Sequence, residues 1–299
     1  MKVHLYDFRW LDGNTTEFQA SVQNKLGKKQ VQKGDVISLE NCSTPKCAGS
    51  MNPEGIWSPC PEHAEGKAKC DLCKMRERNF IFTAFDGFDR SNVNESDLEK
   101  ISRPHIVYLA LFDTNIVKVG VSRLERKELR QLEQGAHFTL FIAETPDGIT
   151  ARQIETLFRK SGIADKVKVS QKRDFICPEI TPEEGVSFLR KILGQHQQSL
   201  SEHEYLKKFL LKDPTFANWE NQYALKKIQE NPKGFHSIEL KAGESVSGTI
   251  ISMKGPFLIL ETAEELLSIS TKDLLGREID FSSKPIGLYL NNAFQSALF

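Results

Sequence analysis

The sequence predicts an α+β protein whose two ends are rich in β-strands and whose centre mixes strands with helices. Three observations predict this class. Stretches of alternating apolar and polar residues, typical of strands, open and close the chain. A cysteine-rich segment follows the first of these stretches. In the middle, two continuous apolar runs precede helices with recognisable start signals. A chain of 299 residues is long enough for two or three domains.

Residues 1 to about 40 are expected to form three or four short antiparallel strands. Apolar and polar residues alternate along this stretch, and breaks occur at Asp12-Gly-Asn and Lys33-Gly-Asp. Tight turns favour Asp, Asn and Gly, so these breaks are typical of turns between strands. We therefore place an N-terminal β module over residues 1–75, which includes the cysteine-rich segment.

Five of the six cysteines lie in the segment from Cys42 to Cys73. With one histidine they form three closely spaced pairs: Cys42-x4-Cys47, Cys60-x2-His63 and Cys70-x2-Cys73. Zinc binds four thiolate or imidazole ligands in a tetrahedron, and short-spaced pairs supply such ligands with little loop closure. We predict a zinc knuckle with four favoured ligands: Cys42, Cys47, Cys70 and Cys73. The alternative ligands are Cys60 and His63, and six candidates also leave room for a second zinc.

Structural disulfides are the alternative interpretation of these cysteines. The segment is rich in Gly, Pro, Lys and Glu, and its aliphatic content is too low to bury a core alone. A structural zinc supplies folding free energy on the order of 10 kcal/mol. A metal therefore also explains how this segment folds.

The first residues, Met1-Lys-Val-His, lead directly into a strand pattern without an apolar signal region. No apolar run approaches the length of a membrane span. We therefore expect a cytoplasmic protein without a membrane partner. Thiols stay reduced in the cytoplasm, which favours zinc over disulfides.

Residues 76–194 are expected to form a mixed α/β core. Residues 106–112 and 116–121 are apolar runs separated by the turn signal Asp113-Thr-Asn, which predicts a hairpin of buried strands. A helix follows over residues 123–134, with Gly135 just beyond its end, and then a third strand over residues 138–143.

Two further helices are predicted from capping signals. Thr150-Ala-Arg-Gln resembles a capping box that opens a helix through Lys160. Thr181-Pro-Glu-Glu has the same pattern, with proline at the first helical position. Residues 195–233 are expected to be a helical connector, interrupted at Asp213-Pro. From residue 234 onward the pattern predicts a small C-terminal β domain that extends to residue 299.

The net charge of the chain is zero, which does not mark it as a nucleic-acid binder. The charge is unevenly distributed, however. Residues 118–173 contain twelve Lys and Arg against seven Asp and Glu. Such a local excess can contact phosphates, although a solvated surface explains it equally well.

The middle of the chain resembles a nuclease signature. Ile106-Val-Tyr108, separated by nine residues from Lys118-Val-Gly120, resembles the two strands of the GIY-YIG nuclease superfamily. A longer string, His105-x-Val-Tyr-Leu-Ala, Lys118-Val-Gly-Val-Ser-Arg and Arg130-x3-Gln-Gly-Ala, resembles the domain of unknown function 2797 family. In that family a cysteine-rich segment precedes a GIY-YIG-like core. The resemblance covers nearly the whole chain and implies a fold and a site layout.

The resemblance implies four catalytic residues. Tyr108, with His105 as a further base or phosphate contact, would handle the attacking water. Arg130 would stabilise charge that develops on the phosphate, and Glu155 would bind Mg²⁺. Lys118 stands where the signature has its second tyrosine, and a lysine there fits phosphate binding better than water activation.

Nucleic-acid phosphates are expected to contact Lys118, Arg123 and Arg126. Each candidate of the site also has a structural alternative. Tyr108 fits a core tyrosine, and Arg130 is spaced to pair with Glu133 on its own helix. Glu155 follows Arg152 by three residues, the spacing of an ordinary helix ion pair.

The sequence thus predicts a protein that binds or processes RNA or DNA, with a structural zinc and a GIY-YIG-like core. In its sharpest form it is a divalent-metal-dependent phosphodiesterase. One alternative is a non-catalytic RNA- or DNA-binding module. The other is an RNA-modification enzyme or its accessory subunit.

Overall fold

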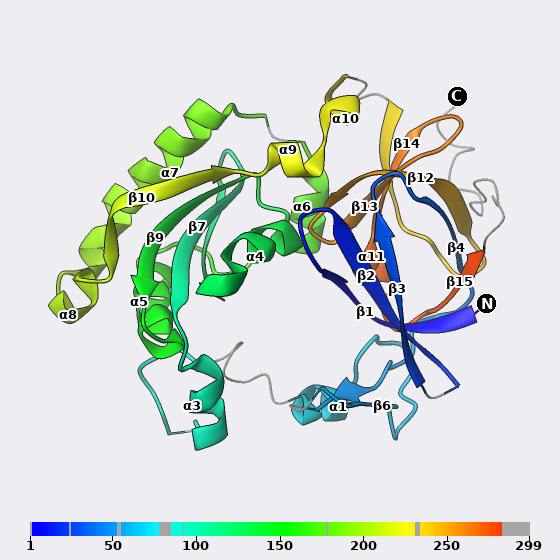
Figure 1. Ribbon diagram of the computed structural model, residues 1–299, viewed down its shortest axis with the longest axis horizontal. Coiled ribbons are helices and arrows are strands. Elements are labelled where there is room, and N and C mark those ends of the chain that lie inside the picture. The colour runs from blue at the N-terminus through cyan, green and yellow to red at the C-terminus, as the bar shows by residue number, and fades with distance from the viewer. Residues whose placement is uncertain are drawn as a thin grey trace. The chain divides into compact units, whose positions relative to one another are not determined.

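The computed structural model describes residues 2–23, 25–52, 55–77, 85–91, 93–177, 179–230 and 234–282 (Figure 1). Contacts divide the chain into two units. One unit combines Met1–Asn79 with Tyr223–Phe299, and the other is Phe80–Gln222. Both contain strands and helices, so the α+β class predicted from the sequence is confirmed at this level.

The first unit is built on a nine-stranded sheet with the order β11-β14-β13-β12-β4-β15-β1-β2-β3. The N-terminal strands are β1 (Lys2–Trp10), β2 (Thr15–Val22), β3 (Lys25–Gln32) and β4 (Val36–Asn41). The C-terminal strands are β11 (Phe235–Ile238), β12 (Ser245–Lys254), β13 (Phe257–Glu261), β14 (Leu266–Ser270) and β15 (Glu278–Ser282). The short helices α10 (Lys226–Glu230) and α11 (Thr271–Leu274) accompany them.

The last described strand joins the two ends of the chain. In β15, Ile279 pairs with Val3 of β1 on one side and with Asn41 of β4 on the other. Strand β12 also pairs with β4. The predicted N-terminal module and C-terminal domain are therefore not separate, because each supplies hydrogen-bonding partners for strand edges of the other. Residues 283–299 of the predicted C-terminal domain lie outside the described residues.

The cysteine-rich segment of the first unit contains little regular structure. It holds the two-stranded sheet of β5 (Ser50–Met51) and β6 (Trp57–Ser58), followed by the helix α1 (Asp71–Arg76). Glu77, just after α1, accepts a hydrogen bond from the Tyr6 hydroxyl at 2.6 Å. Lys69 forms an ion pair with the same carboxylate and lies over the Tyr6 ring. These contacts attach the segment to β1.

The second unit contains an antiparallel sheet with the strand order β10-β9-β7-β8. Its strands are β7 (His105–Asp113), β8 (Ile116–Arg123), β9 (Phe138–Thr145) and β10 (Leu210–Asn218). The longer helices are α4 (Lys127–Gln134), α5 (Gly148–Lys160) and α7 (Pro182–His196). The shorter ones are α3 (Glu95–Ile101), η1 (Leu124–Arg126), α6 (Val169–Asp174), η2 (Gln197–Leu200), α8 (Glu204–Lys207) and α9 (Glu220–Tyr223).

Alternation along β7 divides its residues between the two faces of the sheet. Val107, Leu109 and Leu111 belong to the core that α5 and α7 cover, where they meet Phe158 and Leu189. Figure 1 shows α4 on the opposite side of this sheet from α5 and α7. The predicted hairpin is confirmed: β7 is buried as expected, whereas β8 is only partly buried, and β7 lies between β8 and β9 in the sheet.

Helix boundaries follow the local signals with one correction. Gly135 ends α4 in the left-handed conformation, with φ of 73°, as expected. Thr181 and Glu184 form the predicted capping box of α7. Helix α5, however, begins at Gly148, because the Asp147 carboxylate caps it by accepting from the Thr150 amide at 2.7 Å. Thr150 therefore lies inside the helix that it was expected to open.

The predicted helical connector over residues 195–233 is wrong in its middle. Residues 210–218 form β10, which pairs with β9 at the edge of the sheet. Pro214 lies within this strand. An edge strand tolerates proline because it has one side free of ladder hydrogen bonds. Among the described helices, none combines the length and apolar character needed to cross a membrane.

Candidate metal centre and arginine-lined pocket

Four cysteines of the first unit converge on one point. The sulfur atoms of Cys47, Cys60, Cys70 and Cys73 all lie within 4.8 Å of one another, and all four residues are buried. The Sγ atoms of Cys60 and Cys70 are 3.8 Å apart. All four are free thiols, because a disulfide needs sulfur atoms at about 2.05 Å.

The separations fit a tetrahedral metal ion. Zinc–thiolate bonds of about 2.3 Å in a tetrahedron place neighbouring sulfurs about 3.8 Å apart. The described apolar side chains packed against the cluster are only partly buried, namely Ala64 and Leu72. Apolar packing around the four cysteines is therefore too sparse to account for their burial. A group of four thiols at this spacing could hold a metal such as zinc.

Local backbone geometry brings these cysteines together. Cys70 caps the start of α1, and its sulfur accepts a hydrogen bond from the Cys73 amide at 3.5 Å. The Cys70 amide in turn donates to the Cys47 sulfur at 3.2 Å. Gly49 has φ of +86°, and a Cβ there would lie 2.2 Å from the Ser58 carbonyl oxygen, so only glycine fits the turn after Cys47.

The thiols differ in their ease of ionisation. Burial opposes ionisation of Cys60, but hydrogen bonds from the Ala64 and Glu62 backbone lower its pKa to about 7. Burial raises the pKa of Cys73 far above the usual thiol range, and the neighbouring sulfurs raise it further. A cation at the centre of the cluster would stabilise the thiolate form of all four.

The favoured ligand set is therefore corrected at one position. Cys42 lies outside the cluster and is only partly buried, with its sulfur 3.7 Å from the Glu40 carbonyl oxygen. It follows β4 directly, so pairing in the large sheet holds it away from the other sulfurs. Cys60, an alternative in the sequence analysis, takes its place. His63 is exposed and does not belong to the cluster.

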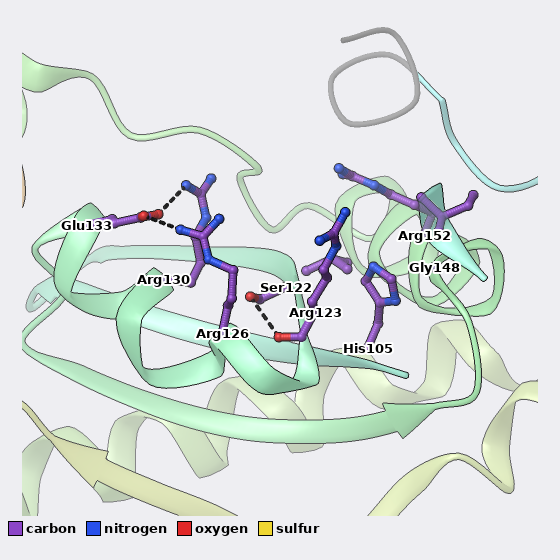
Figure 2. A pocket seen from close by; sticks show the side chains of 10 residues that line it. His105, Ser122, Arg123, Arg126, Arg130, Glu133, Gly148 and Arg152 are labelled. Carbon is purple, nitrogen blue, oxygen red and sulfur yellow. Dashed lines mark hydrogen bonds and ion pairs between the residues drawn. The ribbon is translucent and has the colours of Figure 1, made fainter. Parts of the chain in front are cut away.

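A pocket of about 340 Å³ lies in the second unit. It is formed by the start of β7, the end of β8, and the helices next to them. Figure 2 shows the side chains that line it. The lining residues are Ile101, His105, Val121, Ser122, Arg123, Arg126, Arg130, Glu133, Gly148 and Arg152.

Two of the pocket arginines share one carboxylate. Glu133 accepts from Arg126 at 2.5 Å and from Arg130 at 3.2 Å. These residues lie on successive turns of η1 and α4, so the helix itself aligns them. Burial opposes the charge on Arg130, but the Tyr108 hydroxyl and Glu133 outweigh it and raise the guanidinium pKa. Both arginine side chains remain nearly half exposed.

The other arginines approach from the opposite end of the pocket (Figure 2). Arg123 ends β8 and is the cross-strand partner of His105. Arg152 extends from α5 and forms an ion pair of 2.5 Å with Glu155. Glu155 is buried, and it is not among the residues that line the pocket.

His105 is held in a defined tautomer. Its Nδ1 lies 2.6 Å from the Arg103 carbonyl oxygen, which can only accept, so Nδ1 carries the proton. Burial lowers the pKa of His105 and outweighs the hydrogen bond to the Arg103 carbonyl group, which raises it; Arg123 and Arg152 lower the pKa further, and Asp147 raises it. The ring is therefore neutral at pH 7 and Nε2 is a hydrogen-bond acceptor. A Cβ on Gly148 would lie 3.1 Å from Nε2, so this glycine gives the imidazole its space.

The model of the family described as Protein of unknown function (DUF2797) matches residues 34–279. The chain belongs to this family. A search of curated proteins finds no match, and neither does a search of solved structures. The DUF2797 match includes the four clustered cysteines and every residue that lines the pocket.

The structure of this DUF2797 family member brings together part of the site predicted from the sequence. His105, Arg123, Arg126 and Arg130 all line the pocket. Lys118 does not: it lies near the start of β8, away from the pocket at the strand's end, and forms a backbone bridge to residue 164.

Tyr108 is 1% exposed and its hydroxyl accepts a hydrogen bond from Gln134 at 2.5 Å. Gly120 lies directly opposite on β8, and a Cβ there would come within 2.6 Å of the hydroxyl oxygen. The two signature residues are thus packed against each other, and Tyr108 does not line the pocket.

Sequence reasoning missed Arg152 as a member of the pocket and considered it only as a partner of Glu155. The available signal was its position one turn after the start of α5, the end of the helix where a positive backbone dipole also attracts anions. Glu133 was noticed only as a partner of Arg130. Its role in aligning two arginines depends on η1 as well as α4.

Proposed function

We propose that this DUF2797 protein binds nucleic acid by accepting phosphate in the arginine-lined pocket. One observation carries the proposal: four guanidinium groups from β8, η1, α4 and α5 converge on one pocket. Among the described lining residues, Glu133 is the single carboxylate. Like charges repel one another, so such a gathering lowers stability unless an anion neutralises it. Arginine also presents a planar fork of donors that matches phosphate oxygens.

Two further observations favour nucleic acid over other anions. Residues 118–173 carry an excess of five positive charges, of which the four arginines and Glu133 of the pocket account for three, and such an excess can contact phosphates. The β7–β8 hairpin followed by α4 also has the order of the GIY-YIG-like core that the sequence resembles. In this proposal the four-cysteine cluster binds a structural zinc that folds the segment between β4 and α1.

The test is the salt dependence of binding. Fluorescence anisotropy would measure the affinity for single-stranded and duplex RNA and DNA over a series of salt concentrations. Replacing one phosphate-contacting arginine lowers the log–log salt slope by about one unit. We expect this for Arg126→Ala, whose side chain is nearly half exposed. The exposed Arg190 of α7 gives the matched control, Arg190→Ala, with an unchanged slope.

Two outcomes would contradict the proposal. One is the absence of binding to every substrate at low salt. The other is binding that Arg126→Ala and Arg130→Ala leave unchanged. In the second case nucleic acid binds elsewhere on the chain. An accessory role in RNA modification would use the same pocket to bind RNA, so it also predicts a lower salt slope for Arg126→Ala.

Phosphodiester cleavage is the second candidate. Its support is the order of Tyr108, Arg130 and Glu155 along the GIY-YIG-like layout, together with the ion pair between Glu155 and the pocket residue Arg152. Glu155 would have to release Arg152 before it could bind Mg²⁺. If the protein cleaves, Glu155→Gln lowers the Mg²⁺-dependent rate by about 10²–10³ without loss of binding. If the parent protein binds nucleic acid but cleaves none with Mg²⁺ or Mn²⁺, only the binding function remains supported.

A further inference from the structure

The pocket carries more positive charge than one internal phosphodiester would neutralise. Four arginines and one carboxylate, Glu133, line the pocket, and Glu155, outside the lining, offsets Arg152. Glu125 approaches Arg123 only to 4.0 Å, and its side chain is exposed. Among the described residues, these four arginines keep an excess of about two positive charges over the carboxylates paired with them. An internal phosphodiester carries one negative charge, whereas a phosphomonoester carries about 1.5 to 2 at pH 7.

The size of the pocket also limits what enters it. At about 340 Å³ it lies near the lower end of the range for small-ligand pockets. Proteins that hold the inside of a strand use grooves that contact roughly 4 to 16 nucleotides. A pocket of this size accommodates about one nucleotide, which the end of a strand supplies without the strand passing across the site.

His105 adds a requirement of a different kind. Its Nε2 is an acceptor, because Nδ1 donates to the Arg103 carbonyl group and the ring is neutral. Arg123 and Arg152, on the same side of the pocket, supply only donors (Figure 2). The matching ligand therefore has a hydroxyl donor close to its anionic oxygens. A terminal nucleotide with a free sugar hydroxyl beside its phosphate has this combination.

We infer that the pocket binds the phosphorylated end of a nucleic-acid strand. The terminal phosphomonoester contacts the four arginines, and a hydroxyl of the end nucleotide donates to His105. This inference rests on the proposed nucleic-acid binding and names the part of the strand that the pocket recognises.

The experiment compares one single-stranded RNA sequence in three forms, with a 5′-phosphate, with a 3′-phosphate, or with hydroxyls at both ends. An internal fluorophore reports binding at fixed salt. We expect one phosphorylated form to bind at least tenfold more tightly than the unphosphorylated form at pH 7.5. The preference should fall at pH 5.5, because the second phosphate pKa is about 6 and the monoanion dominates there.

The affinity ratio within one protein sample does not depend on the folded fraction, so it remains meaningful for a destabilised variant. Arg126→Ala and Arg123→Ala should each reduce the ratio at least threefold, whereas Arg190→Ala should leave it unchanged. His105→Gln should lower affinity for the phosphorylated strand without abolishing the pH effect, since that effect belongs to the ligand.

The outcomes separate this inference from the proposed function. Equal affinity for all three forms, still dependent on Arg126, overturns the inference and leaves nucleic-acid binding in place. No binding by any form overturns both. Competition by inorganic phosphate or a mononucleotide as strong as by the phosphorylated strand also overturns the inference, because the ligand is then a small phosphate compound.

Discussion

The cysteine cluster predicts how many thiols of the native protein react with a small colorimetric thiol reagent. The chain has six cysteines. Four are buried in the cluster with at most 5% exposure, whereas Cys42 and Cys177 are partly exposed. If the cluster binds zinc, two thiols react in the native protein and six react after denaturation with a chelator. Elemental analysis should find one zinc per chain.

Two serine variants test which cysteines hold the metal. Cys60→Ser removes one of four converging sulfurs and should reduce bound zinc to well below one equivalent per chain. Cys42→Ser should keep one equivalent, because this sulfur lies outside the cluster. Zinc binding stabilises small zinc domains by about 10–16 kcal/mol. Its loss should therefore unfold the segment around α1, which hydrogen exchange would detect as lost amide protection in residues 47–76.

Either of two results would refute this reasoning. Zinc lost in Cys42→Ser and kept in Cys60→Ser would restore the ligand set favoured by the sequence. A reduced protein without any metal, in which four thiols still resist the reagent, would show that packing alone holds the cluster.

Two further predictions concern the second unit. Gly120→Ala places a Cβ against the buried Tyr108 ring and should lower the free energy of unfolding by about 1–3 kcal/mol in urea denaturation; Gly194→Ala in α7, which meets nothing within 4 Å, is the control and should not destabilise. Burial lowers the pKa of His105 in the folded state. As the pH decreases below about 6.5, the unfolded chain therefore takes up more protons at this residue than the folded chain, and the free energy of unfolding decreases. His105→Gln should flatten that part of the stability curve between pH 7.5 and 5, and an unchanged slope would contradict the assignment of a neutral buried imidazole.

Local signals in the sequence determined the β7–β8 hairpin, β9 and the three longer helices of the second unit. The turn between two apolar runs predicted the β7–β8 hairpin, and Thr181 with Glu184 predicted the start of α7. Gly135 marked the end of α4. These features depend on residues a few positions apart, so the information needed to predict them lies within a short window. The same holds for the close pair Cys70 and Cys73.

The tertiary structure decided every feature that joins distant residues. It placed β15 between β1 and β4, and it made a strand of residues 210–218 because β9 offered an edge for pairing. It selected Cys60 over Cys42, since both follow a plausible spacing but only one reaches the other sulfurs. It also brought Arg152 to Arg123 and His105. Spacing along a chain limits which groups can be neighbours, but hydrogen bonding between strands and burial of helices determine which ones are.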